Sequence, residues 1–464
     1  MVSPRSVTAF VCVVAVLSLA GCAARLPDVS RLMEQVVLPG KSPAISGGGV
    51  KLSERRSERI IAGIEQRAGT TDLLENNAVL MEALSGHPLT AGNKATLLVD
   101  GPATFAAISR AIDEARDHVN VEIYNFEDDE VGRRFADLLP QKQEHGVGIH
   151  LIYDSVGCMN TPASFFKRLR DSGVKIVEFN PINPAKWGTR KLVTRRDHRK
   201  VVIVDGKVAF TGGVNFSNVY SGSSSRSGGG GNVTEFGWRD THVMIEGPAV
   251  AQFQKLFFKT WQEQNGPSLG DRNYFPALEP KGVELVTVIG GSPVDPNRLT
   301  YIMYVAAIKK AERFVHLTNS YFVPDEQTLD ALTAASRRGV DVELVLPGKS
   351  DFSMTLYAAQ SHYEDMLEAG IKLYEHRDRV LHAKTAVIDG VWSTIGSTNF
   401  DLWSFARNEE INAIILGVDF ANQLEALFEK DKEESIEVTP GEWSVRPLFT
   451  RMREWIARLL SPWL

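Results

Sequence analysis

Short runs of β-branched residues occur in pairs along the chain, and an Asp-Gly dipeptide separates the two members of each pair. One pair covers residues 200–204 and 208–211, and the other covers residues 386–388 and 391–395. Two β-branched runs divided by Asp-Gly predict a strand, a tight turn and a second strand. The sequence therefore predicts the same strand pair at two places.

Apolar residues at helical spacing follow each predicted strand pair. They are Phe253, Leu256, Phe257 and Trp261 in the first case, and Phe420, Leu424, Leu427 and Phe428 in the second. Apolar stripes of this kind are typical of helices that cover a sheet. We expect both aromatic stripes to pack in the core rather than to bind a ligand.

The repeat extends upstream of the strand pairs. Residues 111–115 and 307–311 share an Ala-Ile and a later Ala, and each segment is predicted to be a helix that leads into a strand, at 119–124 and 314–321. Helices that alternate with short strands indicate an α/β fold. We predict two similar α/β sandwich halves about a pseudo-twofold axis, each with a mixed, largely parallel sheet. The predicted divisions are a signal peptide at 1–21, a tether and helical lead-in at 22–87, the first half at 88–275, the second half at 276–440 and an amphipathic tail at 441–464.

Each strand pair carries the motif H-x-K-x-x-x-x-D. The motif residues are His198, Lys200 and Asp205, then His382, Lys384 and Asp389, and an Asn follows ten residues after each Asp, at Asn215 and Asn399. Alternate residues of a strand share a face, so each His should lie beside its Lys. Each Asp is seven residues after the His and should not share that face. We group all six motif residues as catalytic, and we interpret both Asp residues as turn and scaffold residues.

The side chains of the motif suit chemistry at phosphorus. A neutral imidazole can attack phosphorus, and a protonated imidazole can donate a proton to a leaving group. Lys supplies positive charge and Asn supplies an amide donor to phosphate oxygens. Two copies would place two histidines, two lysines and two asparagines around one phosphate. We therefore expect neither a metal nor another cofactor.

With these paired motifs, the chain resembles the phospholipase D superfamily and, most closely, its cardiolipin synthase branch. The resemblance extends from about residue 88 to 432 and includes 196–200, 238–241 and 321–325. It implies that an acidic residue downstream of each motif orients the catalytic imidazole, and the matching positions are Asp240 and Glu410. The longer spacing in the first half reflects a Gly/Ser-rich insertion at 221–232. The first half departs from the pattern at Gly213, where the second half has Ser397.

The N-terminus predicts a targeting segment. Arg5 precedes an apolar run at 7–20 that is too short for a comfortable membrane span. The sequence Leu-Ala-Gly-Cys, ending at Cys22, resembles a bacterial lipobox, so we expect Cys22 to be lipidated; the alternative is a plain secretory leader. We expect a lipid-anchored protein that faces the periplasm. Ala23 favours the outer over the inner membrane.

The net charge and the cysteine count limit the binding partners and the disulfides that the chain can have. The net charge is −6 and the pI is about 6.0, so the chain has no global basic footprint and we expect no nucleic-acid partner. Of the three cysteines, Cys12 lies in the N-terminal apolar run, Cys22 ends that run and is the expected lipidation site, and Cys158 stands alone, so no internal disulfide framework is available once the leader is removed. We expect Cys158 to be a buried structural thiol. The oligomeric state stays open.

Two further segments have alternative interpretations. Leu448, Met452, Trp455, Ile456, Leu459 and Trp463 recur at helical spacing among Arg451, Arg453 and Arg458. This tail is either an interfacial membrane helix or a terminal helix docked on the protein. The basic residues Lys186, Arg190, Lys191, Arg195 and Arg196 either steer anionic headgroups or form a solvated loop.

The resemblance implies phosphatidyl transfer, with phosphatidylglycerol as donor, a second lipid hydroxyl as acceptor and cardiolipin as product. The same residues would also serve a phospholipase D that hydrolyses phospholipids, or a nuclease of the superfamily. Outside enzymes, a lipoprotein that binds anionic lipid without catalysis is the alternative. We expect a phospholipid substrate and a membrane surface as partners.

Overall fold

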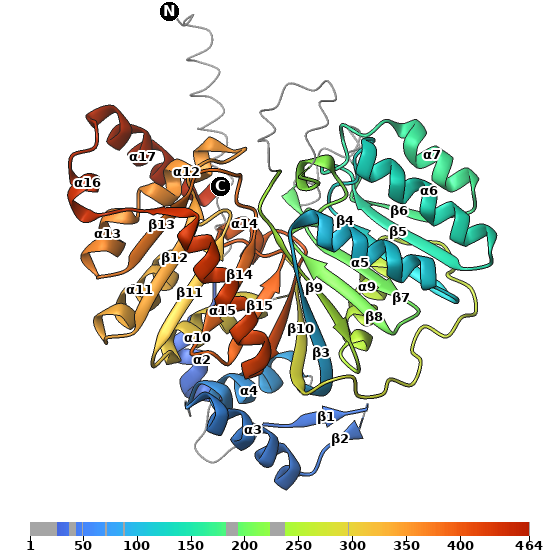
Figure 1. Cartoon of the computed structure of the whole chain (residues 1–464), viewed down its shortest axis with the longest axis horizontal. Helices are drawn as coiled ribbons and strands as arrows, with labels where there is room; N and C mark the ends of the chain where they lie inside the picture. The colour runs from blue at the N-terminus through green and yellow to red at the C-terminus, as the bar shows by residue number, and fades with distance from the viewer. Residues whose placement is uncertain are drawn as a thin grey trace, which may run out of the picture.

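Two halves with the same strand order form the body of the molecule (Figure 1). The computed structural model describes residues 26–36, 43–48, 50–69, 72–86, 89–181, 194–222, 237–295 and 297–463. The strands of the first half are β3 (Leu89–Val99), β4 (His118–Ile123), β5 (Gly148–Asp154), β6 (Lys175–Phe179), β7 (Lys200–Val204), β8 (Val208–Gly212) and β9 (Thr241–Glu246). Its helices are α5 (Asp100–Glu114), α6 (Glu130–Glu144), α7 (Ala163–Asp171), η2 (Asn218–Tyr220) and α9 (Val250–Glu263).

The second half repeats this arrangement. Its strands are β10 (Glu284–Gly291), β11 (Phe314–Asn319), β12 (Asp341–Pro347), β13 (Lys372–His376), β14 (Lys384–Ile388), β15 (Trp392–Gly396), β16 (Glu410–Leu416) and β17 (Ser435–Glu437). Its helices are α10 (Leu299–Lys310), α11 (Glu326–Arg337), α12 (Ser353–Gln360), α13 (Tyr363–Glu368), α14 (Leu402–Ala406) and α15 (Val418–Glu433). The predicted strand pairs are β7–β8 and β14–β15, and both Asp-Gly turns are where the sequence predicts them.

The ladder order is β6–β5–β4–β7–β8–β9–β3 in the first half and β13–β12–β11–β14–β15–β16–β10 in the second. An antiparallel pairing between β3 and β10 joins the two halves into one sheet. Within each of these seven-strand orders, two ladders are parallel and four are antiparallel, and in the second half β17 adds a further antiparallel ladder with β13. The expected mixed sheet is confirmed, but the expectation that it is largely parallel is wrong, because each strand–turn–strand pair adds antiparallel ladders.

Helices cover both faces of the sheet, and its central strands are buried throughout. Near-continuous apolar runs such as 200–204 suit a strand covered on both faces. One apolar cluster combines α9 and α15 with strands of both halves, so the two aromatic stripes are core residues, as predicted. Two larger clusters belong to one half each, one to the first half and one to the second half together with the N-terminal segment.

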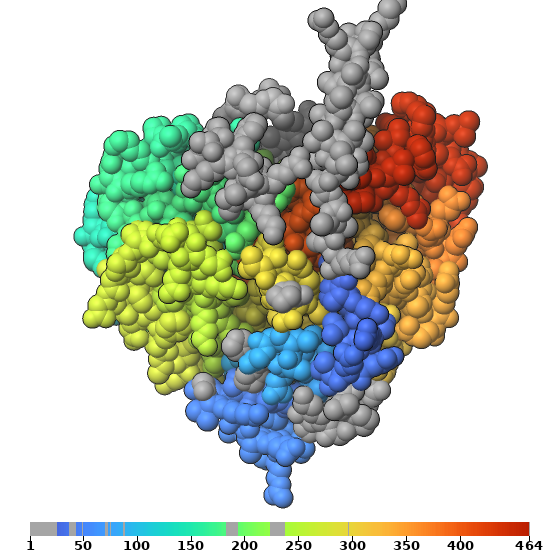
Figure 2. Space-filling model, turned by 180° about the vertical axis from the view of Figure 1, so that it is seen from behind, coloured from blue at the N-terminus to red at the C-terminus, as the bar shows by residue number. Residues whose placement is uncertain are grey.

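The described residues between 26 and 86 lie against α10 and α15 of the second half and against β3, and they occupy the lower and middle part of the view in Figure 2. They form α2 (Val29–Val36), β1 (Ile45–Gly47), β2 (Val50–Lys51), α3 (Glu54–Ala68) and α4 (Asp72–Ser85). The described part of the expected tether is thus packed rather than free, because Val29 and Ile45 are buried and β1 pairs with β3. The first strand of each half, β3 from Leu89 and β10 from Glu284, begins shortly after the predicted start of that half at residue 88 or 276. The domain boundaries themselves stay predictions.

The chain ends in α16 (Pro440–Ser444), α17 (Leu448–Leu460) and η3 (Ser461–Trp463); α16 lies at the outer edge of the second half, and the chain then runs inward to η3, which contacts α14 (Figure 1). Of the helices that the structure describes, none combines the length and apolar character needed to cross a bilayer.

Candidate active site

Each motif histidine directly precedes its strand, and its backbone is attached to the opposite half. The His198 N–H donates to the Glu409 carbonyl (2.9 Å), and the His382 N–H donates to the Arg239 carbonyl (2.7 Å). Parallel bridges join Asp197 to Glu409 and Arg239 to Leu381. The two attachments are reciprocal, as a twofold axis requires. The predicted pseudo-twofold relation is confirmed by this exchange.

The exchange also sets which carboxylate each imidazole contacts. His198 Nδ1 lies 3.0 Å from both carboxylate oxygens of Glu410, and His382 Nδ1 lies 2.7 Å from Asp240 Oδ2. Asp240 and Glu410 thus both contact a motif imidazole, as the resemblance implies, and each contacts the histidine of the opposite half. Glu410 and Asp240 each follow the residue that holds the opposite histidine backbone. With Nδ1 donating to a carboxylate, Nε2 is left free for phosphorus or for a proton.

Each motif lysine lies beside its histidine, as strand alternation predicts. Lys200 Nζ donates to the His198 carbonyl (2.6 Å) and lies 5.0 Å from the ring centroid of Tyr124. Lys384 Nζ donates to the His382 carbonyl and to Ser320 Oγ (2.8 Å). Burial lowers the pKa of Lys200 to about 7 and that of Lys384 to about 8. Both ammonium groups are therefore costly to bury without an anion.

The two half-sites are electrostatically one site. Burial is the largest influence on both imidazoles and lowers the pKa of His198, and it lowers that of His382 well below its usual value. Lys200 and Lys384 each act on both imidazoles in the same direction. The side chains of His198 and His382 keep 12% and 7% of their surface exposed, so both still reach solvent. A bound anion would relieve the repulsion among these four groups.

The two motif asparagines are held by different partners. Asn215 Oδ1 accepts from the Asn125 N–H (3.2 Å), and Asn215 Nδ2 donates to Tyr220 Oη (3.1 Å). Asn399 Oδ1 accepts from Ser320 Oγ (2.8 Å), the hydroxyl that Lys384 also contacts. Both side chains are buried. For Asn215, donation to a phosphate would require its Nδ2 group to give up the bond to Tyr220.

Asp205 and Asp389 lie outside this group, at the far ends of β7 and β14. Both have left-handed backbone conformations, with φ of 52° and 53°. Asp205 accepts from the backbone N–H groups of residues 116–118, and Asp389 accepts from those of residues 312–314. Grouping them as catalytic is therefore corrected, whereas the turn and scaffold interpretation is confirmed. Each Asp ties its turn to the start of the neighbouring strand, β4 or β11.

Gly213 and Ser397 make the half-sites unequal in a specific way. Ser397 Oγ donates to Glu410, the partner of His198. A Cβ at Gly213 would lie 2.1 Å from Asp240 Oδ1, which is closer than any real contact. The glycine is thus required by the close approach of Asp240. Burial raises the pKa of Asp240 to about 6. Burial also acts to raise the pKa of Glu410, but His198, Lys200 and Ser397 outweigh it and the pKa is lowered.

Several aromatic residues of the site were not singled out from the sequence. Tyr124 stacks edge-on against His198 (5.0 Å between centroids), and Tyr321 does so against His382 (6.2 Å). Tyr220 and Trp238 pack against His382 only, at 5.7 and 5.3 Å. The two tyrosines end the repeated strands at 119–124 and 314–321, which was an available signal. Tyr220 and Trp238 flank the Gly/Ser insertion, which has no counterpart in the second half.

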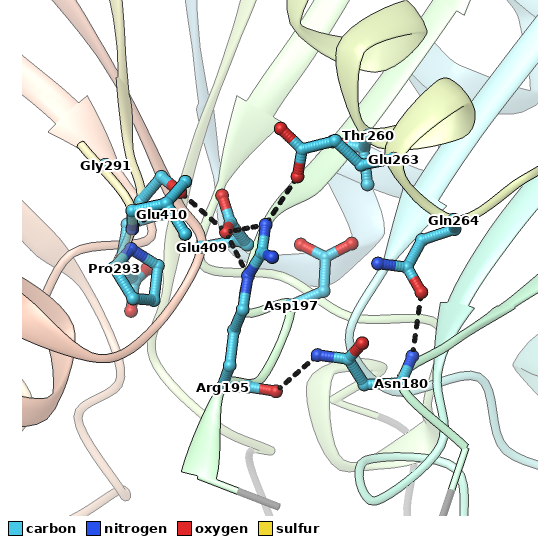
Figure 3. A network of polar contacts seen from close by, with 12 residues as sticks. Asn180, Arg195, Asp197, Thr260, Glu263, Gln264, Gly291, Pro293, Glu409 and Glu410 are labelled. Atoms are coloured by element: carbon cyan, nitrogen blue, oxygen red, sulfur yellow. Dashed lines mark hydrogen bonds and ion pairs between the residues drawn. The ribbon is translucent and has the colours of Figure 1, made fainter. Parts of the chain in front are cut away.

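Ion pairs hold the crossing point beside His198. Arg195 bonds Glu409 and Glu263 (Figure 3). Arg199 is buried and bonds Glu409 (2.8 Å) and Glu122 (3.3 Å). At the opposite crossing the charge is reversed, because Arg239 forms a two-bond ion pair with Asp431. Removing one partner of such a buried ion pair lowers the stability of the fold strongly, because the other charge is left buried without a partner.

The described residues test some of the remaining predictions, on the basic stretch, the cysteines and a metal, and leave others untested. In the basic stretch, Arg195 pairs with Glu409, and Arg196 lies 3.6 Å from Asp154. Lys186, Arg190 and Lys191 lie outside the described residues. Cys22 and the signal segment lie outside them as well. Cys158 is buried and free, and burial raises its pKa to about 12, which suits a structural thiol. Two groups of His, Asp and Glu around His316 are close enough for an ion but contain no motif residue. The absence of a metal requirement stays a prediction.

A family model described as "Cardiolipin synthase, PLD-like domain" matches residues 108–223 and 304–432, together more than half of the chain. The chain belongs to this family of phospholipase D-like proteins. The matched segments contain both motifs, both asparagines and Glu410.

Curated family members match over most of the chain. Cardiolipin synthase A of Pseudomonas putida is 36% identical over 386 residues, covering 82% of this chain and 77% of that protein. A cardiolipin synthase of Geobacillus thermodenitrificans is 33% identical over 380 residues, covering 82% and 74%. A phosphatidylserine synthase structure from Haemophilus influenzae has a TM-score of 0.59 at 12% identity, covering 86% of this chain and 99% of that one. This last likeness shows the fold alone.

Proposed function

We propose that this family member is a phosphatidyltransferase that makes cardiolipin from phosphatidylglycerol. The observation that carries the proposal is the reciprocal pairing of two imidazoles with two carboxylates around two buried lysines. It leaves two Nε2 atoms at one electropositive site. The identities of 33–36% to curated cardiolipin synthases over most of the chain support the substrate.

In the first step, His198 Nε2 attacks the phosphorus of phosphatidylglycerol. A P–N bond forms, the P–O bond to the headgroup glycerol breaks, and His382, which the bound anionic phosphate favours in its doubly protonated form, gives its Nε2 proton to the leaving alkoxide. In the second step, a hydroxyl of another phosphatidylglycerol attacks phosphorus, His382 accepts its proton, and the P–N bond breaks. The products are cardiolipin and free glycerol. The lowered pKa of Glu410 supports His198 as the nucleophile, because an ionised partner stabilises the cationic phosphohistidine.

Lys200, Lys384, Asn215 and Asn399 serve the phosphate oxygens during both steps. Their charge and amide donors stabilise the transition states, so neutralising either lysine should lower turnover by roughly 10²-fold or more. Two in-line displacements at one phosphorus retain its configuration, and the kinetics should be ping-pong. A chelator should have little effect. A chirally labelled donor that gives inversion, or activity that a chelator abolishes and a divalent ion restores, would contradict this mechanism.

Water is the competing acceptor, so hydrolysis by the same site is the second candidate. The deciding experiment incubates the purified full-length protein with phosphatidylglycerol vesicles and measures cardiolipin, glycerol and phosphatidic acid. Equal amounts of cardiolipin and glycerol support the transferase. Phosphatidic acid as the main lipid product would assign the protein as a phospholipase D. Lipid binding without any product would leave the non-catalytic lipoprotein, and cleavage of a nucleic acid instead would assign a nuclease.

We infer that the protein acts at the periplasmic face of a membrane, anchored through a lipid on Cys22, with the outer membrane favoured. The lipobox-like residues 19–22 after the apolar run support this anchoring. Cys22→Ala should abolish incorporation of labelled fatty acid. Unchanged labelling of that variant would contradict the anchor without touching the catalytic proposal.

A further inference from the structure

The C-terminal helix α17 docks on the protein with the face opposite to its apolar stripe. Its inward face carries Glu454 and Ala457, which are 3% and 0% exposed. Its large apolar residues remain exposed: Leu448 (81%), Phe449 (62%), Met452 (48%), Trp455 (61%), Ile456 (40%) and Leu459 (55%). A surface helix normally buries its apolar stripe against the core. An exposed stripe of this size marks an interaction surface.

Polar contacts hold α17 in this orientation. Arg446 bonds Glu454 (3.0 Å) and Glu364 (3.2 Å), which joins the helix to α13. Arg453 bonds Tyr357 Oη (3.1 Å) on α12, and Arg458 bonds Asp365 (3.3 Å). The inward Ala457 packs with Val323 and Ala358 in a small cluster of its own. The most exposed residues of the stripe therefore contribute little to docking, and they can be changed without undoing the fold.

The helix borders the second half-site. It packs on α12, whose N-terminus follows Asp351, and Asp351 accepts a hydrogen bond from Tyr321 Oη (2.5 Å) beside His382. Phe352, between them, is 51% exposed. Beyond α17, the carbonyl of Pro462 accepts from Arg407 (3.5 Å), just after α14. A surface that the stripe rests on would thus lie next to the residues around His382.

We propose that the stripe on α17, residues 448–459, seats the second half-site on an anionic phospholipid bilayer. Trp455 within the stripe suits the boundary between water and acyl chains. Exposed Arg451 and half-exposed Arg458 flank the stripe and complement anionic headgroups, although the whole chain has a net charge of −6. The proposal rests on the proposed function, because an anionic lipid substrate then lies in the same bilayer. It adds the surface through which the site meets that bilayer.

The first test maps contact directly. Full-length protein is bound to vesicles of phosphatidylglycerol and phosphatidylcholine that contain a phospholipid with a photoreactive acyl chain, and labelled peptides are identified after illumination. We expect label in residues 448–463. Vesicle-bound protein without label in this segment would overturn the proposal. This readout needs no turnover, so it stands even if the proposed activity fails.

The second test compares the double variant Trp455→Glu/Leu459→Glu with Val50→Glu/Val283→Glu. The control residues are at least as exposed as the test residues, at 68% and 64%, and lie away from α17. The readout is the ratio of turnover on phosphatidylglycerol vesicles to turnover on monomeric short-chain phosphatidylglycerol. We expect this ratio to fall at least about tenfold in the α17 variant and not in the control, because two apolar side chains leave the interface.

Other occupants of the stripe give different results. If a second copy covered it, the α17 variant would dissociate a dimer and the stripe would take no lipid label. An equal ratio in both variants would mean that the stripe does not act at the bilayer. Either result would overturn the proposal. If the wild-type protein turned over neither form of phosphatidylglycerol, the proposed function would fail. The photolabelling would then be the test of whether residues 448–459 contact the bilayer.

Discussion

The two half-sites carry the same His, Lys and Asn, but their surroundings differ. His198 faces Glu410, whose charge is stabilised by Ser397 and whose pKa is lowered. His382 faces Asp240, whose pKa burial raises to about 6, and is enclosed by Tyr220 and Trp238. The first imidazole is thus suited to carry a lasting positive charge, and the second to pass a proton. The sequence repeat supplies the same catalytic side chains twice, and the residues around them make the two half-sites chemically different.

Replacing the histidines tests this division with the largest expected effect. His198→Ala and His382→Ala should each lower turnover of phosphatidylglycerol on the order of 10⁴-fold. A phosphatidyl donor with a p-nitrophenol leaving group needs no general acid in the first step. With it, His382→Ala should still release a burst of p-nitrophenol, and His198→Ala should not. A burst that survives in His198→Ala and is lost in His382→Ala would reverse the assignment.

Replacing the carboxylates tests the crossed pairing. Glu410→Gln and Asp240→Asn should each lower turnover roughly 10²-fold or more, because each imidazole loses its charged partner. With the p-nitrophenol donor, Glu410→Gln should slow the burst and Asp240→Asn should largely spare it. Glu425→Gln is the matched control, since Glu425 bonds His316 (2.8 Å) outside the site. If Asp240→Asn alone slowed the burst, the crossing would not govern the chemistry.

Substitutions at Gly213 and Ser397 test the difference between the two half-sites through smaller losses of turnover. Gly213→Ser should lower turnover by roughly 10²-fold, because its Cβ would displace Asp240 from His382. Ser397→Ala should cost about tenfold, since it removes one hydrogen bond to an ionised carboxylate. Steady-state rates on phosphatidylglycerol measure both. A Gly213→Ser enzyme as active as Ser397→Ala would show that the close approach of Asp240 is dispensable.

The smallest effect is on the pH dependence. As pH falls through about 6, Asp240 loses the charge that supports His382, and as pH rises through about 7 to 8, Lys200 and then Lys384 lose theirs. The profile of kcat/KM should therefore be bell-shaped, with a change of severalfold inside this window, where the groups are only partly titrated, and a fall of about tenfold per pH unit beyond it. Lys200→Arg should move the basic limb upward, because a guanidinium stays protonated. An unchanged basic limb in that variant would mean that Lys200 does not set it.

Sequence periodicity predicted what lies within one half and missed what joins the halves. The odd spacing from His198 to Asp205 correctly placed the aspartate in a turn, because strand alternation is local. The pairing of His198 with Glu410 depends on backbone contacts at Glu409, and no periodicity within a half encodes a neighbour 212 residues away. The parallel content was overestimated because helix–strand alternation suggests crossovers, whereas hairpins add antiparallel ladders.

The crossed carboxylates also affect when the protein can first act. A growing chain that has not reached Glu410 already holds His198, Lys200 and Asn215, but His198 lacks its partner, and the Glu409 backbone that positions it has not been made. Neither half can assemble a working centre from its own residues. Catalytic competence therefore appears late in synthesis and all at once, so an unfinished chain that meets lipid along the way has no means of attacking it.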